Sequence, residues 1–289
     1  MSLFSNILGA KLKPFWEFTT QGTLWRMLVS DGGLFVGEDR DTETKRVSFF
    51  CVEHETGKIL WRNVQFQEQW WIGIETIHKG VVFFHEFASP DMPGHKKIFT
   101  SEISTGKILW SNEELEFLFA HEGCVYATKI EYGLRQFYEL DLYTGAVLRS
   151  LDGQYMDVLR ETIPPKAENV EFPLAFNFSA NEHTELQQRI EKAIAQSRNV
   201  QSVEYMQKNN KLIVSWHDNM SDVPDQPMLN NEIVIMGESS PKVAGKVIYK
   251  DIISVNTVMP VPDTFFGKGN FVYYIKDKKS LVALKIENL

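Results

Sequence analysis

Histidine and cysteine are the residues of this chain that most readily bind metal ions or act as bases and nucleophiles. The 289 residues include seven histidines: His54, His78, His85, His95, His121, His183 and His217. No two of them have the HxH or HExxH spacing that places two imidazoles on one metal ion. We therefore expect no metal site, although a site assembled from separate parts of the fold stays open. The two cysteines, Cys51 and Cys124, lie in apolar runs typical of strands, and we expect buried, reduced thiols.

Acidic residues alternate at Asp39, Asp41 and Glu43, a pattern similar to the start of a calcium-binding loop. The glycine at the sixth position and the terminal bidentate glutamate of such a loop are absent. The pattern therefore favours a solvated hairpin loop. The sequence also lacks the GxSxG, Walker A and GxGxxG motifs, so we predict no catalytic residue and no cofactor.

Two residues are the best candidates for contact with a small ligand, namely Trp71 and Arg26. Neighbouring side chains of a strand face opposite ways, so Trp70 and Trp71 cannot both be buried against one sheet. One of them fills the core, and the other is free to face a ligand with Arg26 nearby. Plain packing between strands is the alternative.

The elements that position these residues are repeats. The sequence TGKILW occurs at residues 56–61 and 105–110. A less similar third copy lies at residues 144–149, and Gly245–Tyr249 is a degenerate fourth copy. Repetition at this scale marks copies of one supersecondary unit stacked into an array. A second turn precedes the TG turns by about two dozen residues and contains Gly or Asn, which permit tight hairpins. These turns are at residues 31–33, 79–80, 122–123, 209–210 and 269–270.

Apolar strands flank each turn and predict four strands per repeat. The strands expected before the hairpins are Leu24–Val29, Trp70–Ile77, Leu115–Ala120, Val200–Met206 and Ile252–Met259. Four antiparallel strands per repeat predict an all-β fold, a β-propeller of about five four-stranded blades in one domain, residues 1–289. We expect an N-terminal strand at Pro14–Phe18 to close the last blade. Six blades stay possible, because 100 residues separate Gly145 from Gly245.

An insertion at roughly residues 152–199 interrupts the repeats. Ser179–Glu182 fits a capping box, and Leu186, Ile190, Ala193 and Ile194 then fall on one face of a helix ending near Ser197. We predict one amphipathic α-helix, which packs on its own chain or on a partner.

The TGKxLW pattern resembles the repeat of PQQ-type (quinoprotein-like) β-propellers, in which the glycine makes the turn and the tryptophan packs between blades. Gly57 with Trp61 and Gly106 with Trp110 match this pattern. Arg149 and Tyr249 replace the tryptophan in the later copies. The chain also resembles uncharacterised bacterial propeller families with such repeats. The length and the separated cysteines depart from quinoprotein dehydrogenases, so the resemblance implies the fold and not the quinone.

Net charge and the length of the apolar segments indicate which partners and which cellular compartment to expect. The formal charge of −8 opposes binding to nucleic acid or to an anionic membrane. No apolar run approaches the roughly 20 residues of a membrane-spanning helix. The N-terminal apolar residues precede Lys11 and Lys13, the reverse order of a secretory signal, so we expect a cytoplasmic protein.

The longer connections are acidic and are expected at one end of the propeller. They are residues 37–46, 62–69, 86–97, 111–118 and 217–232, with 14 Asp or Glu against 6 Lys or Arg. The predicted partner surface comprises Asp39, Asp41, Glu113, Glu114, Asp222 and Asp225. Because function concentrates on loops held by a rigid scaffold, we predict a non-catalytic scaffold that binds a protein or peptide at this face. The alternatives are a hydrolase or lyase acting on a small polar substrate in the central channel, and a degenerate quinoprotein relative that still holds a quinone.

Overall fold

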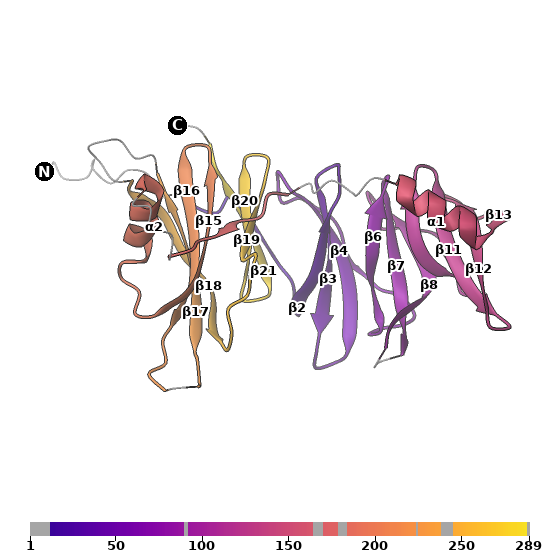
Figure 1. Cartoon of the computed structure of the whole chain (residues 1–289), viewed down its shortest axis with the longest axis horizontal. Helices are drawn as coiled ribbons and strands as arrows, with labels where there is room; N and C mark the ends of the chain where they lie inside the picture. The colour runs from indigo at the N-terminus through magenta and orange to yellow at the C-terminus, as the bar shows by residue number, and fades with distance from the viewer. Residues whose placement is uncertain are drawn as a thin grey trace, which may run out of the picture. The chain divides into compact units, whose positions relative to one another are not determined.

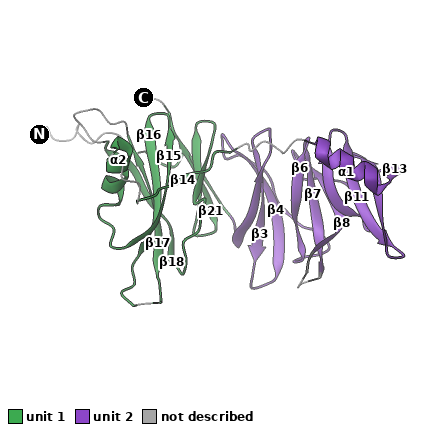
Figure 2. Ribbon diagram, viewed as in Figure 1, with its two compact units in different colours: residues 1–19, 170–289 green, residues 20–169 purple. Residues whose placement is uncertain are grey.

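The computed structural model describes residues 12–89, 92–163, 170–178, 184–223, 225–237 and 245–287. In these ranges the chain is all-β apart from two short helices, and its strands form five antiparallel sheets (Figure 1). The chain divides into two compact units (Figure 2). Unit 1 contains Met1–Thr19 and Val170–Leu289, and unit 2 contains Thr20–Asn169. Neither described helix has the length and apolar character needed to cross a membrane.

Unit 2 consists of three four-stranded sheets, each hydrogen-bonded in chain order. The first contains β2 (Thr23–Val29), β3 (Leu34–Asp41), β4 (Arg46–Glu53) and β5 (Ile59–Val64). The second contains β6 (Ile72–His78), β7 (Val81–Ser89), β8 (Met92–Glu102) and β9 (Ile108–Asn112). The third contains β10 (Glu116–His121), β11 (Cys124–Glu131), β12 (Leu134–Asp141) and β13 (Val147–Leu151). These meanders confirm the expected four-stranded repeats in this part of the chain.

The TG turn between the third and fourth strands is held by its own side chains. In the second sheet, Thr105 Oγ1 donates to the Glu102 carboxylate at 2.6 Å and accepts the Lys107 N–H at 3.3 Å. The Gly106 N–H donates to the Glu102 carbonyl at 2.8 Å, with Gly106 at φ +71°. This φ lies in the left-handed region that glycine adopts without a Cβ clash. The motif therefore specifies a turn that local hydrogen bonds stabilise.

The tryptophan of each TGKxLW copy packs on the TG glycine of the next sheet. Trp61 Nε1 donates to the Ile103 carbonyl at 2.7 Å, and a Cβ built on Gly106 would lie 2.8 Å from the Trp61 ring. Trp110 repeats the contact against Gly145, where the same distance is 2.5 Å. The glycine thus serves both the turn and the close approach of an indole from the neighbouring sheet.

The core of unit 2 lies between successive sheets. Adjacent residues of β7 supply two different layers, because side chains alternate across a strand. Phe84 packs with Phe49 and Ile74 of the first layer, whereas Phe83 packs with Trp110 and other residues of the second. Both phenylalanines are fully buried.

Unit 1 contains two sheets. One runs β14 (Leu174–Ala175), β15 (Val200–Lys208), β16 (Lys211–Asn219), β17 (Leu229–Met236) and β18 (Val247–Thr257). The other runs β1 (Trp16–Thr19), β21 (Ser280–Lys285), β20 (Phe271–Lys276) and β19 (Phe265–Lys268). β1 pairs antiparallel with β21, with Trp16 opposite Ala283. The prediction that an N-terminal strand completes the last sheet is confirmed.

The predicted strand Ile252–Met259 is wrong as the first strand of the last sheet. Residues 247–257 form the single long strand β18, the outer strand of the preceding sheet, and the last sheet begins at β19. β18 pairs with β17 through three register shifts, which let one strand absorb both the degenerate TG copy and the apolar run after it. Pro260 and Pro262 then follow, and proline cannot donate to a strand ladder.

The insertion contains two helices and a short strand where one helix was predicted. α1 (Gly153–Thr162) begins at the N-cap Asp152, whose carboxylate accepts the Tyr155 N–H at 2.7 Å. α2 (Glu185–Ile194) is capped by Thr184, and the predicted capping box at residues 179–182 lies outside the described residues. The predicted apolar stripe is confirmed, because it packs around buried Ile190 on the β15–β17 face of its own chain.

Several segments predicted as long polar loops are strand. β3 and β4 extend the first hairpin as far as Asp41 and Arg46, and β16 continues to Asn219. Charged residues in these segments are not all solvated. Glu38 and Arg40 are both buried and pair with each other inside the fold.

Candidate functional site

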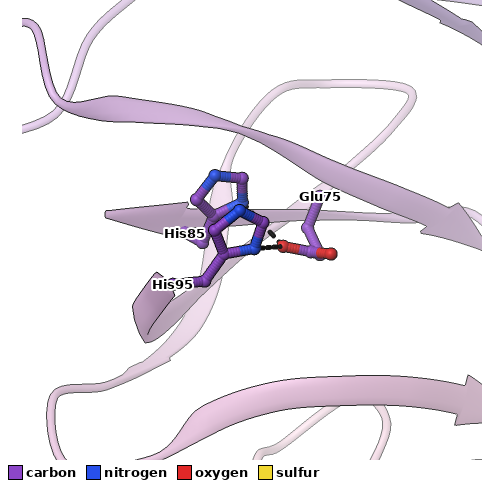
Figure 3. Close-up of side chains that lie close together, drawn as sticks. All are labelled: Glu75, His85 and His95. Atoms are coloured by element: carbon purple, nitrogen blue, oxygen red, sulfur yellow. Dashed lines mark hydrogen bonds and ion pairs between the residues drawn. The ribbon is translucent and has the colours of Figure 1, made fainter. Parts of the chain in front are cut away.

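The candidate site lies on the β6–β8 hairpins of unit 2 and starts from a β-bulge. The register of β6 against β7 shifts between Ile74 and Thr76, which leaves Glu75 without a cross-strand partner. A bulge of this kind re-aims a side chain out of the regular alternation. Here it turns the Glu75 carboxylate toward two histidines on the neighbouring strands (Figure 3).

The two histidines share one face of the sheet. His95 of β8 lies opposite Phe87 of β7, and His85 stands two residues before Phe87. Such diagonal neighbours meet across an antiparallel pair. The His85 and His95 rings are stacked, with centroids 3.4 Å apart and planes 6° apart (Figure 3).

One carboxylate oxygen faces both imidazoles. His95 Nδ1 forms a hydrogen bond with Glu75 Oε2 at 2.7 Å, and His85 Nδ1 lies 2.7 Å from the same oxygen. The second contact is an ion-pair distance without hydrogen-bond geometry, so both ring nitrogens of His85 lack a hydrogen bond among the described residues. His85 is 1% exposed. A buried imidazole with two unsatisfied nitrogens is unusual and requires an explanation.

Electrostatics favour an ionised Glu75 and a neutral His95. Burial opposes ionisation of Glu75, but the short contacts with His85 and His95 and the charges of the two rings outweigh it and lower the pKa of the carboxyl. Burial, followed by the charge of His85, lowers the pKa of His95. A carboxylate beside neutral imidazoles is the protonation state in which such groups coordinate metals.

A buried ion pair from the first sheet supports the bulge. Glu38 Oε1 accepts the Ile74 N–H at 2.8 Å, next to Glu75, and Glu38 Oε2 accepts from Arg40 Nε at 2.8 Å. Arg40 also donates to the Trp70 and Ile72 carbonyls at 2.8 and 2.6 Å. The pair therefore fixes the start of β6 on the neighbouring sheet.

Gly73 leaves room between this pair and the histidine. A Cβ built on Gly73 would lie 3.1 Å from Glu38 Oε1 and 3.5 Å from His85 Nε2. The backbone of β6 can thus approach the unpartnered nitrogen of His85 closely. Any larger side chain at this position would crowd the Glu38 carboxylate.

The structure brings the predicted ligand contacts Trp71 and Arg26 to the border of this cluster. Trp71 is 40% exposed and packs edge-on against Phe87, whose ring packs in turn against both histidines. Arg26 Nη2 donates to the Glu75 carbonyl at 3.4 Å. Their contact with a ligand stays a prediction. Both tryptophans of the pair precede β6, and Trp70 packs under two cations, Arg40 and Lys45.

The three ligand atoms fit a metal ion after a small adjustment. The available nitrogens and carboxylate oxygen of Glu75, His85 and His95 lie within 4.8 Å of one another. Tetrahedral Zn²⁺ with bonds of about 2.0–2.1 Å separates its ligand atoms by about 3.3 Å, against 2.7 Å between Glu75 Oε2 and each Nδ1 here. Parallel rings also point their lone pairs side by side, so coordination requires a ring to turn. His95, one third exposed, is the ligand able to do so.

Sequence reasoning missed this cluster because ten residues separate each member from the next. The antiparallel pairing of β8 with β7 brings the two histidines together, and the bulge in β6 then adds Glu75. The available signal was the presence of two histidines in consecutive strand-like segments of one repeat.

Two carboxylates of the predicted partner surface already accept hydrogen bonds from their own chain. Asp39 accepts the Gln21 and Gly22 N–H groups at 2.9 and 2.7 Å. Asp41 accepts from the Thr44 hydroxyl at 2.6 Å, and the Thr44 contacts lower the pKa of its carboxyl. These carboxylates hold turns of the first sheet.

The remaining acidic residues are exposed. Glu113 and Glu114 have side chains 77% and 79% exposed, with Lys97 and Lys129 at 4.0 and 3.5 Å. They belong to unit 2, whereas exposed Asp222 and Asp225 belong to unit 1.

The antiparallel sheets define an all-β protein that contains several four-stranded meanders. Residues 29–110, which contain the whole candidate site apart from Arg26, match a family described as a domain of unknown function, DUF4905. No curated protein matches the chain.

Solved structures similar to the chain include two whose titles name a propeller. A eukaryotic initiation factor has a TM-score of 0.34 at 10% identity, over 81% of this chain and 56% of that one. A member of the DUF4221 family from Bacteroides vulgatus has a TM-score of 0.29 at 10% identity, over 96% and 95%. The β-propeller domain of the Trilobed protease from Pyrococcus furiosus has a TM-score of 0.31 at 9% identity, over 93% and 79%. The chain thus spans little more than half of the first of these proteins, and none of the likenesses bears on function.

Proposed function

We propose that this protein binds a divalent transition-metal ion through Glu75, His85 and His95, here called the metal cluster. The observation that carries the proposal is His85, whose buried ring has no hydrogen bond at either nitrogen and faces the other two ligands. Unpartnered buried nitrogen is costly, and coordination satisfies it. The PQQ-type repeat resemblance contributes only the turn and the indole packing.

The chemistry of the ligands selects the class of metal. Two imidazoles and one carboxylate suit Zn²⁺ or another first-row transition ion, whereas Ca²⁺ and Mg²⁺ favour all-oxygen sites. Three protein ligands leave a coordination position for water or a substrate. Arg26 and Trp71 border the metal cluster, through the Glu75 carbonyl and the Phe87 ring, and this favours the alternative of an enzyme acting on a small polar substrate.

The test is a titration of the full chain with Co²⁺, whose visible absorption reports nitrogen coordination, followed by competition with Zn²⁺. We expect H95A and E75Q each to weaken Zn²⁺ binding by about 10-fold or more, since each removes a ligand. H121A is the matched control, a half-buried histidine outside the cluster. Equal affinities in all four proteins would overturn the proposal.

A second proposal is that the protein is a scaffold for a protein or peptide partner, with residues 1–289 forming one five-bladed propeller domain. The exposure of Glu113 and Glu114 favours it. The test neutralises Glu113, Glu114, Asp222 and Asp225 and leaves the turn-forming Asp39 and Asp41 unchanged. We expect loss of the partners recovered by the wild-type chain. Unchanged recovery removes this surface from consideration.

A further inference from the structure

A row of polar side chains crosses three strands of the larger sheet in unit 1. Ser202 of β15 lies directly opposite His217 of β16, which lies directly opposite Asn231 of β17. The register of β15 shifts between Val200 and Ser202, and this shift brings Ser202 into line with the histidine. The row is therefore set by a bulge, as in the metal cluster of unit 2.

The side chains of the row are in hydrogen-bond contact. Ser202 Oγ lies 2.9 Å from His217 Nδ1, and the Asn231 side-chain amide lies 2.9 Å from His217 Nε2. His217 and Asn231 are each 1% exposed, whereas Ser202 is half-buried. The row thus connects a solvent-accessible hydroxyl to a fully buried imidazole and amide.

The row continues into a chain whose far end is a carboxylate. Asn231 contacts Ser215 Oγ at 3.0 Å, Ser215 Oγ contacts Thr264 Oγ1 at 2.9 Å, and Thr264 Oγ1 contacts Glu204 Oε2 at 2.7 Å. An ionised carboxylate only accepts hydrogen bonds, so the Thr264 hydroxyl donates to Glu204. The Thr264 hydroxyl then has no proton left for Ser215. The Ser215 hydroxyl must therefore donate its own proton to Thr264 Oγ1.

This direction of donation fixes the orientation of the amide. As placed, Asn231 Nδ2 faces His217 Nε2, Ser215 Oγ donates to Asn231 Oδ1, and Thr264 Oγ1 donates to both Ser215 and Glu204. One hydroxyl proton cannot serve two acceptors, and assigning it to the Glu204 carboxylate makes Ser215 the donor to Thr264. The Asn231 amide must then be turned over, so that its –NH₂ group donates to Ser215 and its Oδ1 faces His217. Atom positions alone do not distinguish the oxygen and nitrogen of an amide, and the hydrogen-bond network decides. The opposite orientation leaves Ser215 with one proton for two acceptors.

The same logic fixes the tautomer of His217. With Asn231 Oδ1 facing it, His217 Nε2 carries the proton and donates, and Nδ1 is a free acceptor for the Ser202 hydroxyl. Burial lowers the pKa of His217, against the opposing charge of Glu204, and so favours the neutral base. A hydroxyl bonded to a neutral imidazole whose other nitrogen is oriented by an amide is the arrangement of an activated nucleophile.

We propose that Ser202 is a nucleophile toward acyl esters, with His217 as its general base and Asn231 as the residue that positions His217. Ser202 Oγ bonds to the ester carbonyl carbon while its proton passes to His217 Nδ1. The alkoxide leaves and takes that proton, which gives an alcohol and acyl-Ser202. Water then attacks the acyl carbon with His217 as base, releasing the carboxylic acid and regenerating the serine.

The test uses diisopropyl fluorophosphate on the full chain in the presence of EDTA, which separates this site from the metal cluster. Ser202 Oγ attacks phosphorus, fluoride leaves, and the serine proton passes to His217. Intact mass and peptide mapping locate the product. S280A is the matched control, because Ser280 is also half-buried and hydrogen-bonded, to the Thr19 hydroxyl at 2.8 Å, without a histidine.

We expect labelling at Ser202 in the wild-type and S280A proteins, none in S202A, and a rate in H217Q lower by about 100-fold or more. Circular dichroism checks the fold of each variant, and if H217Q does not fold, the position of the label in the wild type decides. Labelling of Ser202 no faster than that of Ser280, or an unchanged rate in folded H217Q, would overturn the proposal.

Discussion

Gly145 provides the sharpest test of how the repeats hold the sheets together. A Cβ at this position would lie 2.5 Å from Cδ2 and 2.6 Å from Cε3 of Trp110, and the backbone has φ +68°. Carbon atoms in ordinary contact are about 3.5–4.0 Å apart, so the indole must withdraw by about 1 Å. Gly145→Ala therefore combines backbone strain with the displacement of a packed tryptophan.

The two effects have different sizes. A left-handed non-glycine residue costs about 1–2 kcal/mol. Forcing the indole outward adds about 1–3 kcal/mol for overpacking, and losing the 2.9 Å bond from Trp110 Nε1 to the Leu142 carbonyl adds about 1 kcal/mol. We expect G145A to lower the free energy of unfolding by about 3–6 kcal/mol. Urea denaturation of the full chain, followed by tryptophan fluorescence and circular dichroism, measures this value.

Gly133 supplies the matched control from the same sheet. It has φ +79° and no atom within 4 Å of a built Cβ, so G133A should show only the backbone cost of about 1–2 kcal/mol. In a Trp110→Ala background, the cost of G145A should fall to the G133A value, because the clashing ring is gone. Equal costs of G145A and G133A in the wild-type background would refute the indole–glycine contact.

Three further predictions concern buried groups. Burial opposes ionisation of Asp251, but hydrogen bonds that include Lys276 at 2.7 Å outweigh it and lower its pKa. Its stabilisation is thus present above the unfolded pKa of about 3.9 and is lost as the pH falls through the folded value. D251N should therefore destabilise the chain at pH 7 and progressively less as the pH falls below about 3.9 in thermal melts. Burial raises the pKa of the Cys51 thiol to about 12, and iodoacetamide at pH 8 should modify half-buried Cys124 first by mass spectrometry. Arg40→Met should cost about 3–5 kcal/mol in urea denaturation, because it leaves the buried carboxylate that Arg40 pairs with uncompensated.

The sequence by itself determined the repeated unit and the turns and hairpins within it. The TG turns, the hairpins and the apolar face of α2 depend on local hydrogen bonds and on periodicity, which a single chain displays directly. The N-terminal strand was also predictable, because the last repeat lacked a fourth strand. Trp71 and Arg26 were identified as neighbours of a possible ligand, although nothing in the sequence named the groups they surround.

Only the tertiary structure decided where polar residues are buried. Glu75 and Ser202 reach their histidines through register shifts in β6 and β15, and such shifts depend on pairing with a neighbouring strand. The same pairing turned Glu38 and Arg40, which read as a charged loop, into a buried ion pair. A one-residue change of register moves every side chain to the opposite face, so the composition of a strand cannot reveal which polar groups meet. The candidate sites exist because cross-strand pairing, and not sequence spacing, brings their residues together.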